Sequence, residues 1–194
     1  MAAYRGKEGQ TVLVRNHELS NRESKFGSNV GVAVPDALKY DTWCNGGTTT
    51  LVVDESGQLV RHFASLGGTN NNCAGGLTPW GTWLTCEEIG SDTVSAGGKK
   101  HGYVFEVTAD PQQVTGQAIV NMGRFAHEAA AVDPTNSNVY LTEDSSGKSG
   151  FYRYVPDVKT GAPGSLAMGG VLEMAKVKGR NNVNLAVASV DDIY

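Results

Sequence analysis

The sequence predicts an all-β protein with the architecture of a β-propeller, of which its 194 residues hold about three to four blades. Three observations support this fold class. The chain has 25 glycines between short runs of β-branched residues, a pattern typical of many short strands joined by turns. One segment occurs twice, and repeats of such a period are typical of propellers and other stacked folds. The hydrophobic share of 40% is too high for a disordered chain.

Strands are predicted where β-branched or aromatic residues cluster between turn-forming residues. In chain order they are 11–18, 48–54, 58–63, 80–88, 102–107, 118–122, 126–132, 139–144, 150–155 and 171–177. The second and third form a hairpin pattern around Gly57. Segments 20–36 and 67–76 are rich in polar residues and glycine, and we expect them to be loops. The apolar run 126–132 also suits a helical turn, but Pro134 and the repeat favour a strand.

These strands account for part of a propeller. A full propeller has about 4–8 four-stranded blades, and at roughly 50 residues per blade this chain holds only three or four. We therefore expect residues 1–194 to be a single domain, a partial β-propeller that is incomplete at both ends.

The repeat places possible metal ligands at matching positions. Its first copy begins at Cys73, and its second copy begins 55 residues later at Glu128. Glu88 and Glu143, near the ends of the two copies, keep the same separation. Because equivalent positions of neighbouring repeats point to one region of space, we expect these four residues to converge on a cation.

Three predicted strands end in acidic residues, at Glu18, at Glu87–Glu88 and at Glu143–Asp144. Their carboxylate oxygens suit a hard cation such as calcium, whereas Cys73 and His127 add softer donors that favour a transition metal. The alternative is that acids at strand ends simply face solvent. Two choices stay open: between Glu87 and Glu88, where the offset of 55 favours Glu88, and between Glu143 and Asp144.

Two further residues are candidates for holding a substrate. Asn72 belongs to a stretch that combines amide oxygens, a thiol and flexible glycine backbone. Arg124 could clamp a phosphate or carboxylate by donating two parallel hydrogen bonds. The alternatives are a connecting loop around a structural cysteine, and a plain surface arginine.

Composition excludes several classes of function. A net charge of −4 with no basic stripe argues against a nucleic-acid partner. No stretch approaches the ~20 consecutive apolar residues of a membrane span, so no membrane partner is expected. No apolar segment follows Met1–Arg5, and we expect no export signal in this chain. The odd number of cysteines argues against a complete disulfide framework, and Cys44 and Cys86 are expected to be structural thiols.

Several blocks of the sequence together resemble the PhoX alkaline phosphatase family. They are LVRNHE (13–18), GGTTT (46–50), NCAGGLTPWGTWLTCEE (72–88), KHGYVFEV (100–107), GRFAHE (123–128) and TEDSS (142–146). The blocks follow the order of the family and span roughly residues 1–156. The resemblance implies a six-bladed propeller that hydrolyses phosphate monoesters at a cluster of ferric iron and calcium.

The resemblance also implies roles for individual residues. Cys73 is expected to be the thiolate ligand of iron. Arg124, the candidate catalytic and substrate-binding group, or Arg153 is expected to hold the phosphoryl oxygens. The implied carboxylate ligands are Glu88, Glu128 and either Glu143 or Asp144, with Glu18 serving calcium. The expected partner is a small phosphate monoester, the expected state is a monomer, and the parent family is periplasmic or extracellular.

Members of the family are several hundred residues long, so we expect this chain to be a fragment of such an enzyme. Ligands from later blades would then be missing, and phosphatase activity of this chain alone is not expected. Two other functions fit the same acidic residues. One is a calcium-dependent propeller hydrolase of a phosphodiester, phosphotriester or lactone. The other is a non-catalytic propeller module that binds structural calcium.

Overall fold

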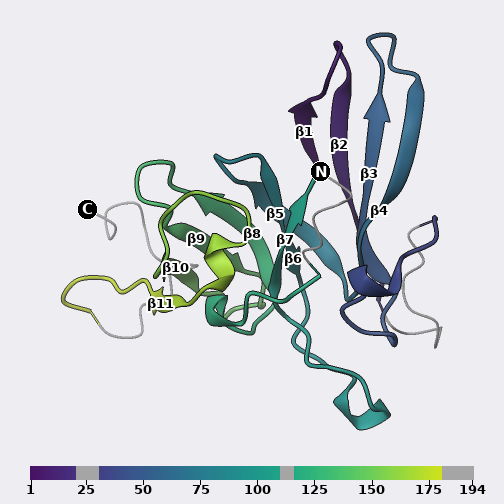
Figure 1. The fold of residues 1–194 in the computed structure, drawn as a ribbon. Coiled ribbons are helices and arrows are strands. Elements are labelled where there is room, and N and C mark those ends of the chain that lie inside the picture. The colour runs from purple at the N-terminus through teal and green to yellow at the C-terminus, as the bar shows by residue number, and fades with distance from the viewer. Residues whose placement is uncertain (21–30, 110–115, 181–194) are drawn as a thin grey trace.

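The computed structural model describes residues 1–20, 31–109 and 116–180, and within these ranges the chain is all-β, as predicted (Figure 1). The strands are β1 Ala2–Arg5, β2 Thr11–His17, β3 Gly46–Val53, β4 Leu59–Thr69, β5 Asn72–Leu77, β6 Thr82–Glu87, β7 Val104–Thr108, β8 His127–Val132, β9 Val139–Glu143, β10 Phe151–Pro156 and β11 Gly170–Met174. Single turns of 3-10 helix lie at η1 Asp36–Leu38, η2 Val94–Ala96, η3 Val120–Met122 and η4 Ser165–Ala167. No helix in these ranges is long and apolar enough to cross a membrane.

The strands form three antiparallel sheets in which neighbours along the chain pair with each other. The first sheet has the order β1-β2-β3-β4, the second β5-β6-β7 and the third β11-β10-β9-β8. Figure 1 shows the sheets side by side in chain order, with the second between the other two. The predicted hairpin of β3 and β4 and the predicted pairing of β9 with β10 are both confirmed.

Two hydrophobic cores lie on opposite faces of the second sheet. Side chains of a strand alternate between faces, so Leu84 and Val104 pack toward the third sheet, and Trp83 and Phe105 pack toward the first. The first of these cores also contains Leu141 of β9. The second sheet is therefore buried on both faces, and it holds the other two sheets together.

The predicted loop at 67–76 is wrong, because β4 continues to Thr69 and β5 begins at Asn72. Its glycines bring backbones together instead of making a long turn. A Cβ atom on Gly75 would lie 1.8 Å from the carbonyl oxygen of Leu84, and one on Gly68 would lie 2.0 Å from that of Asp41. Only glycine permits such close approach inside a sheet.

Three smaller differences concern the ends of sheets. The predicted strand 118–122 is a single bridge between Ala118 and Phe105, followed by η3. Strand β1, at the start of the chain, was not predicted, although it pairs with β2 along its length. Most of the predicted loop 20–36 lies outside the described residues.

Candidate metal site

The two copies of the repeat fold into matching β-bulges. In β5, two residues, Cys73 and Ala74, lie between the pairs that β5 makes with β6, where β6 has only one residue. In β8, Glu128 and Ala129 occupy the same place relative to β9. A bulge re-aims the side chains that it carries, and bulges are frequent beside functional sites. The 55-residue separation of Cys73 and Glu128 thus corresponds to one structural position in two sheets.

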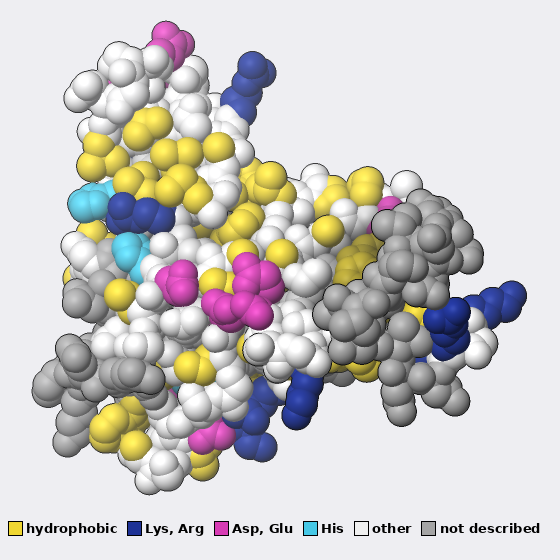
Figure 2. Space-filling model, turned by 180° about the vertical axis from the view of Figure 1, so that it is seen from behind, with side chains coloured by type: hydrophobic (Ala, Val, Ile, Leu, Met, Phe, Trp, Pro, Cys, Tyr) yellow, Lys and Arg dark blue, Asp and Glu magenta, His cyan; other side chains and the backbone are white. Residues whose placement is uncertain are grey.

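Strands β5 and β8 also lie against each other, which brings the two bulges together. A Cβ atom on Gly76 would lie 1.8 Å from the carbonyl oxygen of Ala130, so the backbones approach closely there. An isolated bridge joins Glu88, just beyond β6, to Ala126, just before β8. As a result, one ligand atom from each of Cys73, Glu88 and Glu128 lies within 4.8 Å of the other two. Figure 2 shows acidic side chains gathered on one face of the molecule.

The thiol of Cys73 is half-buried among oxygen atoms. Its Sγ lies 3.4 Å from the carbonyl oxygen of His127 and 3.7 Å from Oε2 of Glu128. Burial raises the pKa of Cys73 to about 12, and the carboxylates of Glu128 and Glu88 add to the rise. The thiol therefore keeps its proton in these surroundings, and a cation would have to replace that proton in order to bind sulfur.

The acidic residues around the thiol repel one another when they are ionised. Burial raises the pKa of Glu88, and a hydrogen bond with Asp144 and the charge of Glu128 raise it further. Asp144 thus joins Cys73, Glu88 and Glu128, although it is exposed to solvent. Crowded carboxylates that disfavour their own ionisation are the donor set that a bound cation stabilises.

Glu143, the fourth residue expected to converge, does not match Glu88. The pairing partners show that Glu143 lies opposite His127 just as Glu87 lies opposite Asn72. Five residues lie between the paired residues Leu77 and Trp83 of the first hairpin, and six lie between Val132 and Val139 of the second, so the separation grows from 55 to 56 residues.

The corrected register separates the acids into two kinds. Oε2 of Glu143 accepts hydrogen bonds from Gly150 N at 2.9 Å and from the hydroxyl of Tyr152 at 2.8 Å. Glu87 is fully buried and accepts four hydrogen bonds, from Asn70 N, His101 Nδ1, Gly102 N and Tyr103 N. Glu87 and Glu143 each bind the backbone just before the next strand. The residue after each of them, Glu88 or Asp144, belongs instead to the group around Cys73.

The candidates for holding a substrate are occupied in other ways. Asn72 is fully buried; its Oδ1 accepts from Thr69, and its Nδ2 donates to the hydroxyl of Thr85. Arg124 donates from Nε to the carbonyl oxygen of His101 at 2.7 Å and from Nη2 to that of Gly90 at 2.8 Å. The contacts of Arg124 fix the backbone between β6 and β7, and those of Asn72 join β5 to the side chains of Thr69 and Thr85. The binding of a phosphate by either side chain stays a prediction.

The remaining candidates lie near the ends of strands β2 and β8. Glu18, one residue beyond β2, is exposed, and it is not among the three residues whose ligand atoms converge. His127, the residue before Glu128, is fully buried, and its ring stacks on that of Phe125 with centroids 3.6 Å apart. Burial lowers the pKa of His127 to about 4, so its imidazole is neutral.

One positioning residue was missed from the sequence. Asn16 of β2 donates from Nδ2 to the carbonyl oxygens of Cys73 and Ala74, at 3.2 and 2.8 Å. Its Oδ1 accepts from Trp83 Nε1 at 2.8 Å and from the hydroxyl of Thr85 at 3.0 Å. Asn16 therefore holds the bulge of β5 from the neighbouring sheet. Its place in the block LVRNHE was noted, but only the fold shows what the amide contacts.

Comparison with known proteins agrees with the motifs. The family model described as alkaline phosphatase PhoX matches residues 55–191, and this is the family that the sequence resembles. Two of the resembling blocks, 13–18 and 46–50, lie outside that match. Searches of curated proteins and of solved structures found no match.

Proposed function

Because this chain belongs to the PhoX alkaline phosphatase family, we propose that Cys73, Glu88, Glu128 and Asp144 hold an iron–calcium centre for the hydrolysis of phosphate monoesters. One observation carries the proposal. Two equivalent bulges of two neighbouring sheets place a thiol and a carboxylate side by side, with Glu88 completing the group. A repeat that served only packing would not require ligand-type side chains at both bulges.

The residues present fit these metals. Thiolate is a soft ligand that suits iron, and carboxylate oxygens suit calcium. Ligand atoms that lie within 4.8 Å of one another can contact one ion at the usual bond lengths of about 2.0–2.6 Å. The raised pKa values of Cys73 and Glu88 have the cause expected of such a site, since burial and neighbouring acids leave negative charge uncompensated.

The roles of the chain's own residues are to hold the metal ions and to orient their ligands. Bound metals would neutralise the phosphate charge and activate an oxygen nucleophile. Asn16 fixes the carbonyl groups of the bulge at Cys73, which sets the direction of the thiol. Glu87 fixes the strand end from which Glu88 projects, through bonds to backbone N–H groups of Gly102 and Tyr103.

We also propose that the three sheets are blades of a propeller. Each is an antiparallel meander, and the sheets follow one another in chain order with cores between their faces. In this arrangement β5 and β8 would be the innermost strands of adjacent blades, with the bulges at the channel. A crystal structure would test this proposal. Sheets that do not lie around a common central axis would contradict it.

The first test is the metal content of the purified chain by mass spectrometry after loading with iron and calcium. We expect Cys73→Ser to lose iron, because serine is a poor substitute for a thiolate ligand. Cys86→Ala is the control, since it removes a thiol that lies in the hydrophobic core and not among the converging ligand atoms, and it should keep iron. Equal iron in the wild type and in Cys73→Ser would contradict the assignment.

The second test concerns substrate class. We expect the loaded chain, where it turns over at all, to hydrolyse p-nitrophenyl phosphate in preference to a diester, a triester or a lactone. Preference for one of the other esters would support the calcium-dependent hydrolase instead. Calcium binding without iron and without turnover of any ester would support the non-catalytic module.

A further inference from the structure

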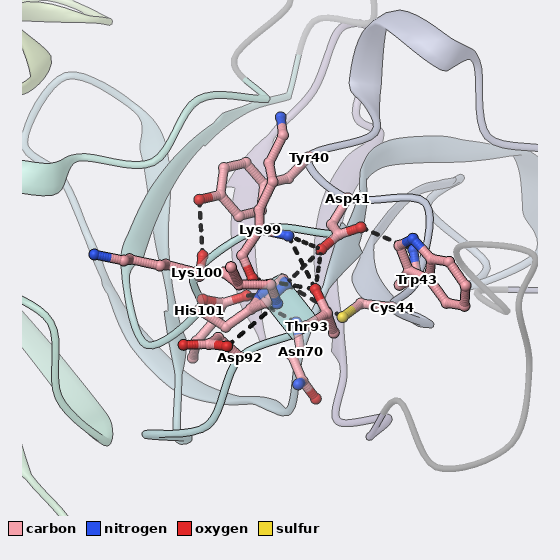
Figure 3. Close-up of polar contacts among 12 residues, drawn as sticks. Tyr40, Asp41, Trp43, Cys44, Asn70, Asp92, Thr93, Lys99, Lys100 and His101 are labelled. Atoms are coloured by element: carbon pink, nitrogen blue, oxygen red, sulfur yellow. Dashed lines mark hydrogen bonds and ion pairs between the residues drawn. The ribbon is translucent and has the colours of Figure 1, made fainter. Parts of the chain in front are cut away.

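A second group of ligand-type side chains lies outside the proposed phosphatase centre. Asp41 and Cys44 lie between η1 and β3, and His101 lies shortly before β7. All three are buried, with exposed fractions of 3%, 0% and 0%. One ligand atom from each lies within 4.8 Å of the other two. Figure 3 shows the dashed contacts of this group converging around Asp41 and His101.

The separations within the group are close to those of a metal site. His101 Nε2 lies 3.1 Å from Asp41 Oδ2 and 3.2 Å from Cys44 Sγ. Ligands of a tetrahedral zinc-like ion lie about 3.3–3.8 Å apart, given bond lengths of about 2.0–2.3 Å. Outward movements of a few tenths of an ångström would therefore admit an ion. Without one, a single proton on Nε2 must serve both Asp41 and Cys44.

The surroundings of His101 match those of a metal-binding histidine. Its other ring nitrogen, Nδ1, lies 2.7 Å from Oε1 of the buried Glu87. Histidine ligands commonly donate their second N–H to a carboxylate, which fixes the ring and directs Nε2 to the metal.

Asp41 is held equally firmly. Its Oδ1 accepts from Trp43 N at 2.9 Å, and its Oδ2 accepts from Lys99 N at 2.7 Å and from the hydroxyl of Thr93 at 2.5 Å. These contacts come from both sides of the group, because Trp43 precedes β3 and the other two flank η2. The carboxylate is thus oriented before any ion binds.

We propose that Asp41, Cys44 and His101 form a structural site for one divalent transition-metal ion of the zinc class. The ion would join the segment before β3 in the first sheet to the segment before β7 in the second. The nitrogen, sulfur and oxygen donors are those that zinc prefers, and a water molecule would fill the fourth position of the tetrahedron. Complete burial of the three side chains favours a structural role. The site shares no ligand with the proposed iron–calcium centre.

The test uses Cys73→Ser as the background, so that the other thiolate site is silenced. Stripped of metal and then titrated with Co²⁺, this chain should bind one equivalent and show the intense absorption of a tetrahedral cobalt thiolate. Zinc should bind with the same stoichiometry by mass spectrometry. Adding Cys44→Ser should abolish the thiolate absorption and weaken zinc binding by at least about 100-fold.

Thermal unfolding gives a second readout. Excess zinc should raise the Tm of Cys73→Ser by several degrees through mass action, and it should leave the double variant almost unchanged. Zinc binding that is equal in the two chains would overturn the proposal. So would the absence of a thiolate absorption in Cys73→Ser itself, an outcome that decides the matter even where the double variant does not fold. Either result would leave a metal-free hydrogen-bonded group.

Discussion

At the scale of single residues, neighbours in the chain have opposite roles. Glu87 is buried, and four donors satisfy its carboxylate. Burial raises the pKa of Glu88, and the acids beside it raise that pKa further. Removing the charge should therefore destabilise the protein at Glu87 but not at Glu88. The difference follows from the alternation of side chains along β6 and its extension.

We expect Glu87→Gln to lower the free energy of unfolding by about 3 kcal/mol. The new glutamine NH2 group would face backbone N–H groups that lose their acceptor oxygen. Glu88→Gln is the matched variant, and in the metal-free chain it should be neutral or stabilising, since it removes repulsion from Asp144 and Glu128. Urea unfolding of the metal-free chains measures both. A comparable loss in both variants would show that Glu88 also accepts stabilising hydrogen bonds.

At the scale of elements, the approach of β5 to β8 depends on a missing side chain. Gly76 has an ordinary backbone conformation, yet a Cβ atom there would overlap the carbonyl oxygen of Ala130. The bulges that carry Cys73 and Glu128 meet only because this contact is possible. Packing between strands, and not turn geometry, explains the glycine.

Gly76→Ala should force the two strands apart and cost about 1–3 kcal/mol by overpacking. It should also weaken metal binding at Cys73, which metal analysis of the folded variant would detect. Gly90→Ala is the control, because nothing lies within 4 Å of a Cβ atom at Gly90 and its backbone has no positive φ. That control should stay within about 0.5 kcal/mol of the wild type. An unchanged Gly76→Ala would mean that the strands are free to separate.

At the scale of the whole molecule, the second sheet takes part in both cores. Leu84 and Phe105 lie in adjacent strands of that sheet but pack toward the third and the first sheet, respectively. Loss of packing on one face should therefore weaken the whole described structure. Cooperative unfolding is the usual behaviour of a domain of this size.

Leu84→Ala should lower the free energy of unfolding by about 2–5 kcal/mol, since it empties part of a fully buried core. We expect a single transition at a lower denaturant concentration, with circular dichroism and fluorescence in agreement. Val171→Ala, at a position that is 60% exposed on β11, should have little effect. Two separate transitions in Leu84→Ala would show that the third sheet unfolds by itself.

The sequence by itself determined the all-β class, most of the strands and the equivalence of Cys73 with Glu128. These depend on local patterns and on a constant spacing, which need no knowledge of distant contacts. Only the tertiary structure decided that Asp144, and not Glu143, contacts Glu88, because the turn between the last paired residues of β8 and β9 has one residue more than that between β5 and β6.

The tertiary structure also decided which side chains are already engaged and which meet unexpectedly. Arg124 resembles a phosphate ligand in the sequence, but carbonyl oxygens of a folded loop accept its hydrogen bonds. Cys44 and His101 are 57 residues apart and belong to no common motif, yet packing of the first sheet on the second brings them within 3.2 Å. Contacts of this kind arise from the approach of whole sheets, which no local pattern encodes.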